Sequence, residues 1–285
     1  MNANPTPIAH VGALLREWRS ARRLSQMDLA LDAGLSTRHL SCIETGKAQP
    51  SRDILARLAD TLEMTLRDRN SLLVAAGYAP RYTESALANP ELAPMRRAIE
   101  AILKQQEPYP AFLMNRHWDI VMANDAAIRM NRWLLGGHDS PHRNMLRHAF
   151  DPQDLRSVLV NWEEIAGTLL AHLHKLVATA PNDGKARSLL EEVLAYPGVP
   201  EKWRQRDLRA VPAPLLETVF ERDGQRVAFF STITTFGTPR DVTLEELHVE
   251  SCFPSDEASE AFCRDLAKTH AGAPTRNPSI HSTKA

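Results

Sequence analysis

The chain has 285 residues, of which 43% are hydrophobic and 24% are charged, and its formal net charge is -1. This length predicts two domains, and this composition is ordinary for a globular protein in water. No apolar run approaches the roughly 18–20 residues of a membrane span, and the polar start, residues 1–7, lacks the basic and apolar stretches of a signal peptide. We therefore expect a cytoplasmic protein without membrane segments.

The charge is unevenly distributed along the chain. Residues 1–79 contain 10 Lys and Arg against 8 Asp and Glu, whereas the remainder is net negative. Four arginines between positions 16 and 23 accompany a single glutamate. This mild asymmetry permits a small basic surface for nucleic acid in the first region, and it excludes a protein covered with basic groups.

The three cysteines are Cys42, Cys252 and Cys263. They are widely spaced, odd in number and form no CxxC pair. A disulfide framework or a structural zinc site is therefore not expected.

Residues 8–79 read as five short helices. The first is predicted by apolar residues at helical spacing between Val11 and Trp18. The second begins after Ser25, a good N-cap, and Asp28 at the third helical position completes a near capping box. Gly34 stands where this helix must stop, because glycine enters the left-handed region without strain.

The third helix follows at once. Ser36 is its expected N-cap, Leu40 and Ile43 are its expected buried residues, and Gly46 ends it. A fourth helix enters through Pro50-Ser51, and a fifth, over 66–76, closes the bundle. The stretch from 79 to 94 contains prolines and polar residues and is predicted to be a linker.

The sequence of residues 8–77 resembles the helix-turn-helix domain of the Cro/C1 and Xre family. The resemblance rests on a Ser-Gln-x-x-Leu-Ala start at 25–30, a Gly-Leu-Ser turn at 34–36 and an Ile-Glu-x-Gly-Lys end at 43–47. It implies binding to double-stranded DNA. The DNA-contacting residues that it implies are Gln26, Ser36, Thr37, Arg38, Ser41, Cys42, Lys47 and Arg52.

Their implied roles differ. Gln26 would bond a phosphate at a helix N-terminus, and Lys47 and Arg52 would also contact phosphates. Arg38 is the strongest candidate for reading bases, since arginine pairs bidentately with guanine. Glu44 is expected to be a structural partner, because a carboxylate facing phosphate would repel it. The alternative for the whole bundle is a protein-docking module.

Cys42 has two interpretations. A thiol that faces bases can act as a redox switch, and it can also be a small, weakly polar filler. The second interpretation is favoured.

The second region changes character. A helix is predicted over 89–106, and alternating residues around Arg116 predict a strand from Phe112 to Met122. A long helix is predicted from Leu155 to Thr179, and a shorter one between Asp183 and Pro197. Three more strands are predicted over 215–221, 226–236 and 245–253, the first two joined by an Asp-Gly hairpin at 223–224. Residues 269–285 are polar and are predicted to be a disordered tail.

This second region shows no signature of an active site. His172 and His174 are two positions apart, whereas metal-binding histidine pairs on helices are four apart. There is no GxSxG, no P-loop and no GxGxxG followed by a helix. We expect neither an enzyme nor a bound metal or cofactor.

The second region resembles the MmyB-like ligand-binding domain over about residues 90–255. The resemblance rests on Pro110-Ala111-Phe112, on 116–121 and 124–127, on Asn144-Met145-Leu146-Arg147, and on Trp162 and Trp203 before a hairpin. It departs at Ala123, where the family often has an aromatic residue. It implies a PAS-like domain with an apolar pocket for a fatty acid or a similar small molecule.

The pocket residues expected from that resemblance are apolar, with plain core packing as the alternative role of each. They are Phe112, Met114, Trp118, Ile120, Trp162, Phe229 and Val249. Arg116, His117 or Arg147 is a candidate to anchor a carboxylate head group, and a surface role is the alternative.

The predicted architecture is thus mainly α with an α+β second domain. A five-helix helix-turn-helix bundle over 8–79 precedes a PAS-like antiparallel sheet with flanking helices over 90–268. We expect a transcription regulator that binds DNA as a homodimer and responds to a small apolar ligand. The alternative is a repressor whose second domain only dimerises.

Overall fold

The computed structural model describes residues 7–204 and 216–269. It divides into two compact units. Among the described residues, the first unit, called the helical unit, contains residues 7–85 together with Lys175–Gly184 and Thr238–Glu245, and the second, called the sheet unit, contains the others. The predicted tail, 269–285, lies outside the described residues except for its first residue, Thr269.

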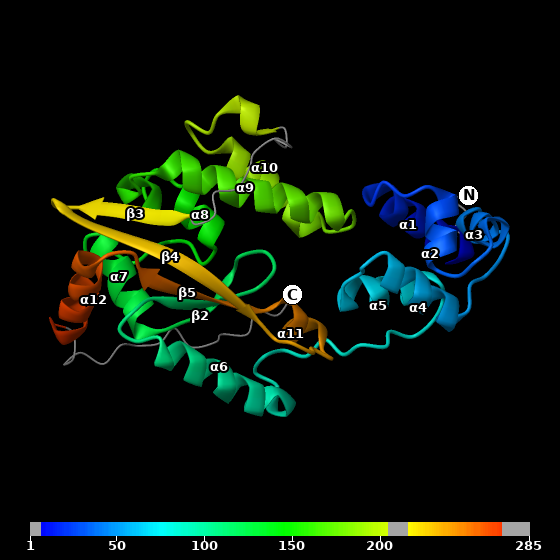
Figure 1. The fold of residues 1–285 in the computed structure, drawn as a ribbon, viewed down its shortest axis with the longest axis horizontal. Helices are drawn as coiled ribbons and strands as arrows, with labels where there is room; N and C mark the ends of the chain where they lie inside the picture. Colours follow the sequence, from blue (N-terminus) through cyan, green and yellow to red (C-terminus); the bar gives the residue numbers. More distant parts are fainter. Residues whose placement is uncertain (1–6, 205–215, 270–285) are drawn as a thin grey trace. The chain divides into compact units, whose positions relative to one another are not determined.

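The first unit is a bundle of five α-helices, as expected (Figure 1). Its helices are α1 (Pro7–Ala21), α2 (Gln26–Asp32), α3 (Thr37–Glu44), α4 (Arg52–Thr61) and α5 (Leu66–Ala75). Trp18 of α1 is almost fully buried, and buried leucines of α2 to α5 surround it in one apolar core. The small Ala30 is also fully buried in this core.

The N-caps predicted for α2 and α3 are confirmed. Ser25 Oγ accepts the amide hydrogen of Asp28, and the Asp28 carboxylate accepts that of Ser25, which forms a complete capping box. Ser36 Oγ accepts the amide of His39 and so fixes where α3 begins. Gly34, with φ of +64°, supplies the left-handed residue between α2 and α3.

The second unit is an α+β fold around a five-stranded antiparallel sheet. The strands are β1 (Ala111–Met114), β2 (Ile120–Ala123), β3 (Glu217–Arg222), β4 (Gln225–Thr235) and β5 (His248–Pro254). Their order across the sheet is β2-β1-β5-β4-β3.

Helices lie on both sides of this sheet in the view of Figure 1, with α9 and α10 above it and α6 and α12 below. The further α-helices of the described chain are α6 (Ala93–Gln105), α7 (Asp125–Leu134), α8 (Met145–Phe150), α9 (Trp162–Thr179), α10 (Gly184–Ala195), α11 (Val242–Glu246) and α12 (Glu257–Thr269). The end of α9 and most of α11 belong to the first unit. Three short 3-10 helices are η1 (Pro90–Leu92), η2 (Leu155–Val158) and η3 (Glu201–Arg204).

The segment predicted to be one strand, from Phe112 to Met122, is instead a hairpin of two strands. The alternation from Phe112 to Met122 is interrupted at Asn115, whose side-chain oxygen accepts the amide hydrogens of His117 and Asp119. Trp118 then takes a left-handed φ of +61°. These local bonds turn the chain, so β1 and β2 pair antiparallel with each other.

Two other boundaries differ from the prediction. The helix expected from Leu155 begins at Trp162, because Asp154 caps a separate 3-10 turn at 155–158. The strand expected from Glu245 begins at His248, because α11 occupies 242–246. The Asp223-Gly224 hairpin is confirmed, with φ of +51° and +78° at its two central residues.

Candidate functional site

The residues predicted to contact DNA gather on α3 and beside it. Thr37 and Arg38 are exposed in the first turn, and Ser41 and Cys42 are half-buried one turn later. Ser36 is exposed, but its hydroxyl is already engaged as the N-cap. On the opposite side of the helix, Leu40 and Ile43 are fully buried in the core. The apolar side of α3 is thus anchored in the core, and short polar groups and one arginine face the solvent.

Glu44, the last residue of α3, is buried and organises the interior of this unit. Its carboxylate pairs with Arg19 of α1 through two bonds, of 2.7 and 3.0 Å. Gln26 Nε2 donates to the same carboxylate at 2.7 Å. Arg16 donates to the Glu44 carbonyl oxygen at 2.9 Å. Glu44 is therefore a structural partner, with hydrogen bonds from α1 and α2.

The electrostatics of Glu44 follow from these partners. Burial alone raises the pKa of its carboxyl, but the hydrogen bonds from Arg19 and Gln26 outweigh burial and leave the pKa below its usual value. The bond to Glu44 in turn raises the pKa of Arg19. Both groups are charged in the folded protein, so the pair is a matched buried ion pair.

Arg16 and Arg19 were not predicted from the sequence to take part in this network. The only signal was the cluster of arginines in α1, which suggested a basic surface. The structure uses Arg19 internally and leaves the Arg16 side chain 54% exposed. Fewer positive charges near α3 are therefore available to DNA than the number of arginines in α1 suggests.

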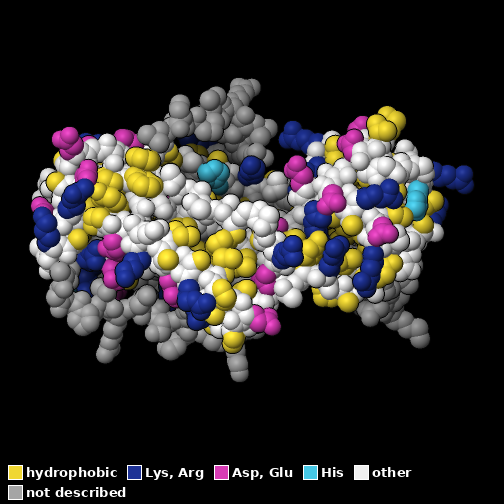
Figure 2. Space-filling model, turned by 60° about the horizontal axis from the view of Figure 1, so that its bottom comes forward, with side chains coloured by type: hydrophobic (Ala, Val, Ile, Leu, Met, Phe, Trp, Pro, Cys, Tyr) yellow, Lys and Arg dark blue, Asp and Glu magenta, His cyan; other side chains and the backbone are white. Residues whose placement is uncertain are grey.

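Lys47 and Arg52 follow α3. Lys47 is exposed, and its amide bonds to the Cys42 carbonyl oxygen at 2.8 Å, which holds the turn after α3. The exposed Arg52 at the start of α4 has its guanidinium 5.0 Å from the centre of the Tyr78 ring. The visible face of the helical unit in Figure 2 carries Lys and Arg mixed with Asp and Glu. The positive charge on this face is thus carried by Lys and Arg residues that lie among acidic residues.

The predicted pocket residues do not all share one side of the sheet. Phe112 and Glu250 are direct cross-strand partners, and so are Leu113 and Val249. Because neighbouring strand residues point to opposite faces, Val249 lies on the face opposite Phe112. Val249 therefore cannot line a cavity on the Phe112 face of the sheet.

Other predicted pocket residues lie in packed surroundings. Phe229 is buried in a core with Met130 of α7 and Cys263 of α12. Trp162 has Phe150 and Trp203 as ring neighbours, at 6.0 and 5.5 Å between centroids. Its indole N–H donates to the Ala149 carbonyl oxygen at 2.8 Å.

The remaining predicted pocket residues lie in or beside the β1–β2 hairpin. Met114 and Ile120 are register partners at a bulge, and Met114 is fully buried. Trp118 lies in the turn between the strands.

The three head-group candidates already have protein partners. Arg116 pairs with Glu246 at 3.3 Å, and Arg147 bonds both oxygens of Glu192, at 2.7 and 2.8 Å. His117 is buried in the hairpin turn, where Asn115 accepts its amide hydrogen. A carboxylate ligand at either arginine therefore competes with a carboxylate of the chain.

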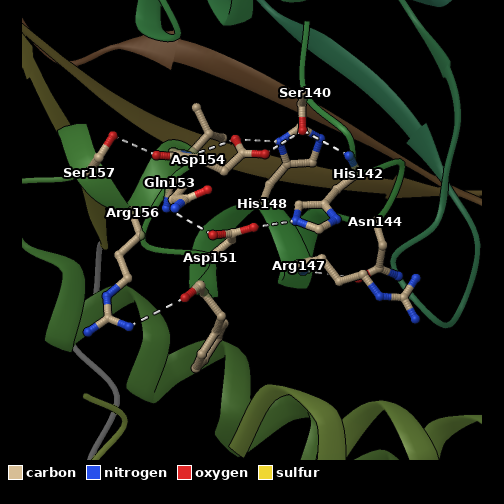
Figure 3. A network of polar contacts seen from close by, with 12 residues as sticks. Ser140, His142, Asn144, Arg147, His148, Asp151, Gln153, Asp154, Arg156 and Ser157 are labelled. Carbon is tan, nitrogen blue, oxygen red and sulfur yellow. Dashed lines mark hydrogen bonds and ion pairs between the residues drawn. The ribbon is translucent and has the colours of Figure 1, made fainter. Parts of the chain in front are cut away.

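A polar network that the sequence argument missed connects the loop before α8 to η2 (Figure 3). The buried Asp154 accepts from Ser140 and from the amide of Leu155, and it pairs with Nδ1 of His148 at 3.1 Å. One turn away, His142 Nε2 lies 2.7 Å from Asp151. The sequence signal for this network was a group of His and Asp residues within 138–154, but their spacing matches none of the motifs considered above.

Burial raises the pKa of Asp154, but the bonds from His148 and Ser140 dominate and lower it overall. Asp154 and Ser140 also line a hollow of about 240 Å³ with Gln153, Ser157 and Arg222. This hollow has a polar lining, unlike the apolar pocket that was expected.

A second hollow, of about 540 Å³, is an open groove between α5 and residues 80–84. Asn70 holds these residues in place, because its oxygen accepts the amides of Arg81 and Tyr82 and its nitrogen donates to the Tyr82 carbonyl. The predicted linker is therefore attached to α5 at this end.

No group of three or more His, Cys, Asp or Glu side chains in 7–204 and 216–269 is arranged to hold a metal ion. Likewise, no helix in the described part of the chain is long and apolar enough to cross a membrane.

Comparison with solved structures finds similarity to two proteins described as regulators. The restriction-modification controller protein C.AhdI from Aeromonas hydrophila is 32% identical, with a TM-score of 0.21, covering 22% of this chain and 94% of that one. The clp gene regulator ClgR from Corynebacterium glutamicum is 26% identical, with a TM-score of 0.23, covering 26% and 92%. None of the curated proteins compared with the chain matches it.

Family profiles match both units. Residues 10–72 match a helix-turn-helix domain, and residues 95–266 match the MmyB-like transcription regulator ligand binding domain. The second match covers more than half of the 285 residues, and it describes transcription regulators rather than enzymes. The chain therefore belongs to the family of helix-turn-helix transcription regulators that carry an MmyB-like ligand-binding domain.

Proposed function

We propose that this regulator binds its operator DNA through α3 and that a small apolar ligand in the sheet unit changes its affinity for that DNA. The observation that supports the DNA-binding half most strongly is the exposed first turn of α3, with Thr37 and Arg38, on a helix whose other side is fully buried. A helix held in this way enters the major groove with its N-terminal residues against base edges.

The proposed contacts divide into base readers and phosphate binders. Arg38 reads a guanine through its guanidinium, and Thr37, Ser41 and Cys42 face neighbouring bases. Lys47 and Arg52 contact phosphates, and Ser36 contributes the capped N-terminus of α3. The protein acts as a dimer in the cytoplasm.

Gln26 has a more defined proposed role. One of its two amide hydrogens is committed to Glu44, which leaves the other for a phosphate at the N-terminus of α2. Glu44 thereby orients the amide before DNA arrives.

The proposed ligand is apolar, and a fatty acid is one member of this class. Phe112, Met114 and Ile120 remain the proposed contacts at one end of the sheet, with Trp118 in the adjoining turn, and Trp162 and Phe229 complete the proposed set. Val249, which was also predicted, lies on the opposite face and is left out of this set. Because Arg116 and Arg147 are already paired with carboxylates, we expect chain length to contribute more to affinity than the head group. Ligand changes DNA affinity only if it binds the two states of the protein differently.

The second candidate is a regulator whose sheet unit dimerises without ligand. The close packing around Trp162 and Phe229 favours this function, since both side chains already have protein neighbours.

The DNA-binding half is tested by selecting bound duplexes from a random pool and measuring affinity for the selected site. We expect Arg38→Ala to weaken binding by about 5- to 150-fold, as loss of one bidentate base contact does. Gln26→Ala should weaken binding to all sequences alike, because it removes a phosphate contact. Arg97→Ala, which removes an exposed arginine on α6, is the control. Unchanged affinity in both test variants would overturn the interface.

The ligand half is tested by solvent extraction of the purified protein followed by mass spectrometry. Fatty acids of increasing length are then titrated against the DNA complex. A length-dependent change in DNA affinity supports the ligand-controlled function, and no change at any length supports the dimerisation function.

A further inference from the structure

The last half of β4 has a neighbouring strand on one side only within the described residues. β3 pairs with β4 from Gln225 to Phe230, whereas Ser231–Thr235 pair only with β5. All five of these residues are exposed, and Ile233 is 63% exposed. An exposed isoleucine at the centre of an unpaired edge is unusual, because such edges favour association.

The direction of the free hydrogen-bonding groups follows from the register. The amide of Cys252 donates to Pro110, which precedes β1, so Cys252 points its backbone towards β1. Backbone direction alternates along a strand, so Ser251 and Val249 point towards β4, where they pair with Thr232 and Thr234.

It follows that Ser231, Ile233 and Thr235 turn their N–H and C=O groups away from β5, towards the open side.

This open edge has the composition of a strand that can pair with itself. The run Ser231-Thr232-Ile233-Thr234-Thr235 contains no charge, no proline and no glycine, and four of its five residues are β-branched. Natural edge strands are protected from pairing by charges, prolines or bulges. None of the three devices interrupts this run or its pairing with β5.

We propose that this edge is the dimer interface: β4 pairs antiparallel with β4 of a second copy about a two-fold axis at Ile233. The inference rests on the proposed function only in that a dimer is what reads a two-fold symmetric operator. The two copies of Ile233 lie opposite each other, and Ser231 of each copy lies opposite Thr235 of the other. Each hydrogen-bonded residue pair exchanges two bonds, which gives about six bonds and one sheet continuous across both copies.

The side chains agree with this pairing. Ile233 meets its own symmetry mate, so the most exposed apolar side chain of the sheet becomes buried. On the other face, Thr232 meets Thr234 of the second copy, and no like charges are opposed. Glu250, the partner of Ile233 on β5, is one strand further from the axis, and burial raises the pKa of its carboxyl.

A contact of five residues buries less surface than a standard stable interface. The dimer should therefore depend on protein concentration in solution. The dimer should become tight when the helix-turn-helix domains of both copies bind one operator, because the contact between the two β4 strands is then intramolecular.

Sedimentation velocity of the full chain, without DNA or ligand, tests the proposal over a concentration series. We expect the wild type to shift from the mass of one chain to twice that mass. Ile233→Lys places two positive charges opposite each other and should remain at the single-chain mass at tenfold higher concentration. Val160→Lys makes the same kind of change at another exposed β-branched apolar residue of this unit and should behave as wild type.

A second variant keeps the test independent of any folding defect. Ile233→Cys places two thiols opposite each other, within the separation that a disulfide spans. Oxidised glutathione should link it into covalent dimers, whereas Val160→Cys and the wild type, with its three native cysteines, should stay unlinked.

A wild type that remains single at all concentrations overturns the proposal, as does an Ile233→Lys protein that dimerises normally or an Ile233→Cys protein that does not crosslink. Because no DNA or ligand is present, these outcomes leave the proposed DNA and ligand contacts standing. Conversely, loss of DNA binding in the α3 variants leaves the dimer test unaffected.

Discussion

The two units of this protein place their functional residues in different ways. In the helical unit, the residues proposed to contact DNA are exposed side chains at the start of α3 or beside it, and short-range caps position them. In the sheet unit, the residues predicted to bind the ligand are distributed over two strand faces, a turn and a filled core. A surface site on one helix is encoded within about twenty residues. A pocket depends on strands that are more than a hundred residues apart.

Buried charge differs between the units in a similar way. Glu44 draws its side-chain partners from two helices that are close in sequence, α1 and α2, and forms an ion pair with Arg19. Asp154 is held by Ser140, by His148 and by the backbone. The first carboxylate positions a proposed DNA contact, and the second joins the loop before α8 to η2. Four predictions, from the largest expected effect to the smallest, test this contrast.

Replacing the central carboxylate of the helical unit should have the largest effect. Glu44→Ala leaves the Arg19 guanidinium, whose side chain is 14% exposed, without its partner and releases Gln26. Removal of one member of a buried ion pair costs about 3–5 kcal/mol. Hydrogen exchange of the α1 and α3 amides should therefore become faster, while the amides of β1 and β5 remain protected.

The control is Glu84→Ala, which breaks the more exposed pair between Glu84 and Arg67. An exposed pair contributes about 0–1 kcal/mol, so exchange in α1 and α3 should be unaffected. Equal effects of the two substitutions would contradict the role given to Glu44.

This contrast also explains how much the sequence predicts. Both ends of α3 were predictable, because Ser36 and Gly46 are local signals that act within one turn. The partner of Glu44 was not, since pairing with Arg19 depends on how α1 crosses α3. The hairpin at 223–224 was predicted, whereas the turn at Asn115 was missed because its apolar flanks continue the alternation of a single strand.

The pocket was the least predictable part. The residue types around Phe112 and Val249 indicate burial, but only the register places Val249 on the other face. Trp162 was predicted in a helix and lies there, although its aromatic neighbours Phe150 and Trp203 are set by tertiary packing. Periodicity predicts which residues are buried and leaves their neighbours undetermined.

The second-largest expected effect is on the stability of the sheet unit in acid. The pKa of Asp154 is lower in the folded chain than in the unfolded chain, so its stabilising contribution is complete above the unfolded pKa, about 3.9. It is lost as pH falls through the folded pKa. Asp154→Asn should lower the free energy of unfolding by about 2 kcal/mol at pH 7 and flatten the loss below about pH 4.

Urea unfolding followed by circular dichroism at pH 7, 5 and 3 measures this. Asp139→Asn is the control, because that carboxylate lies in the same loop and is 86% exposed. A steep acid transition that persists unchanged in Asp154→Asn contradicts the assignment.

Local backbone signals should have intermediate effects in both units. Ser36→Ala removes the cap of α3 and should cost about 1 kcal/mol, with faster exchange at the amide of His39. Gly224→Ala forces a side chain into φ of +78° and should cost a similar 1–2 kcal/mol, although the space around it is open. Only Ser36→Ala should also weaken operator binding, because only α3 carries the DNA contacts; equal weakening by Gly224→Ala would break the distinction between the units.

The smallest effect separates phosphate contacts from structure within the helical unit itself. Lys47 is exposed after α3, and the amide that holds its turn belongs to the backbone, so Lys47→Ala should leave stability unchanged within about 0.5 kcal/mol. If its ammonium neutralises one phosphate, the slope of log affinity against log salt concentration should become shallower by about 0.9. Lys104→Ala, on α6 of the other unit, should keep the wild-type slope. An unchanged slope in Lys47→Ala would contradict the phosphate contact proposed for Lys47 and leave only the one proposed for Arg52.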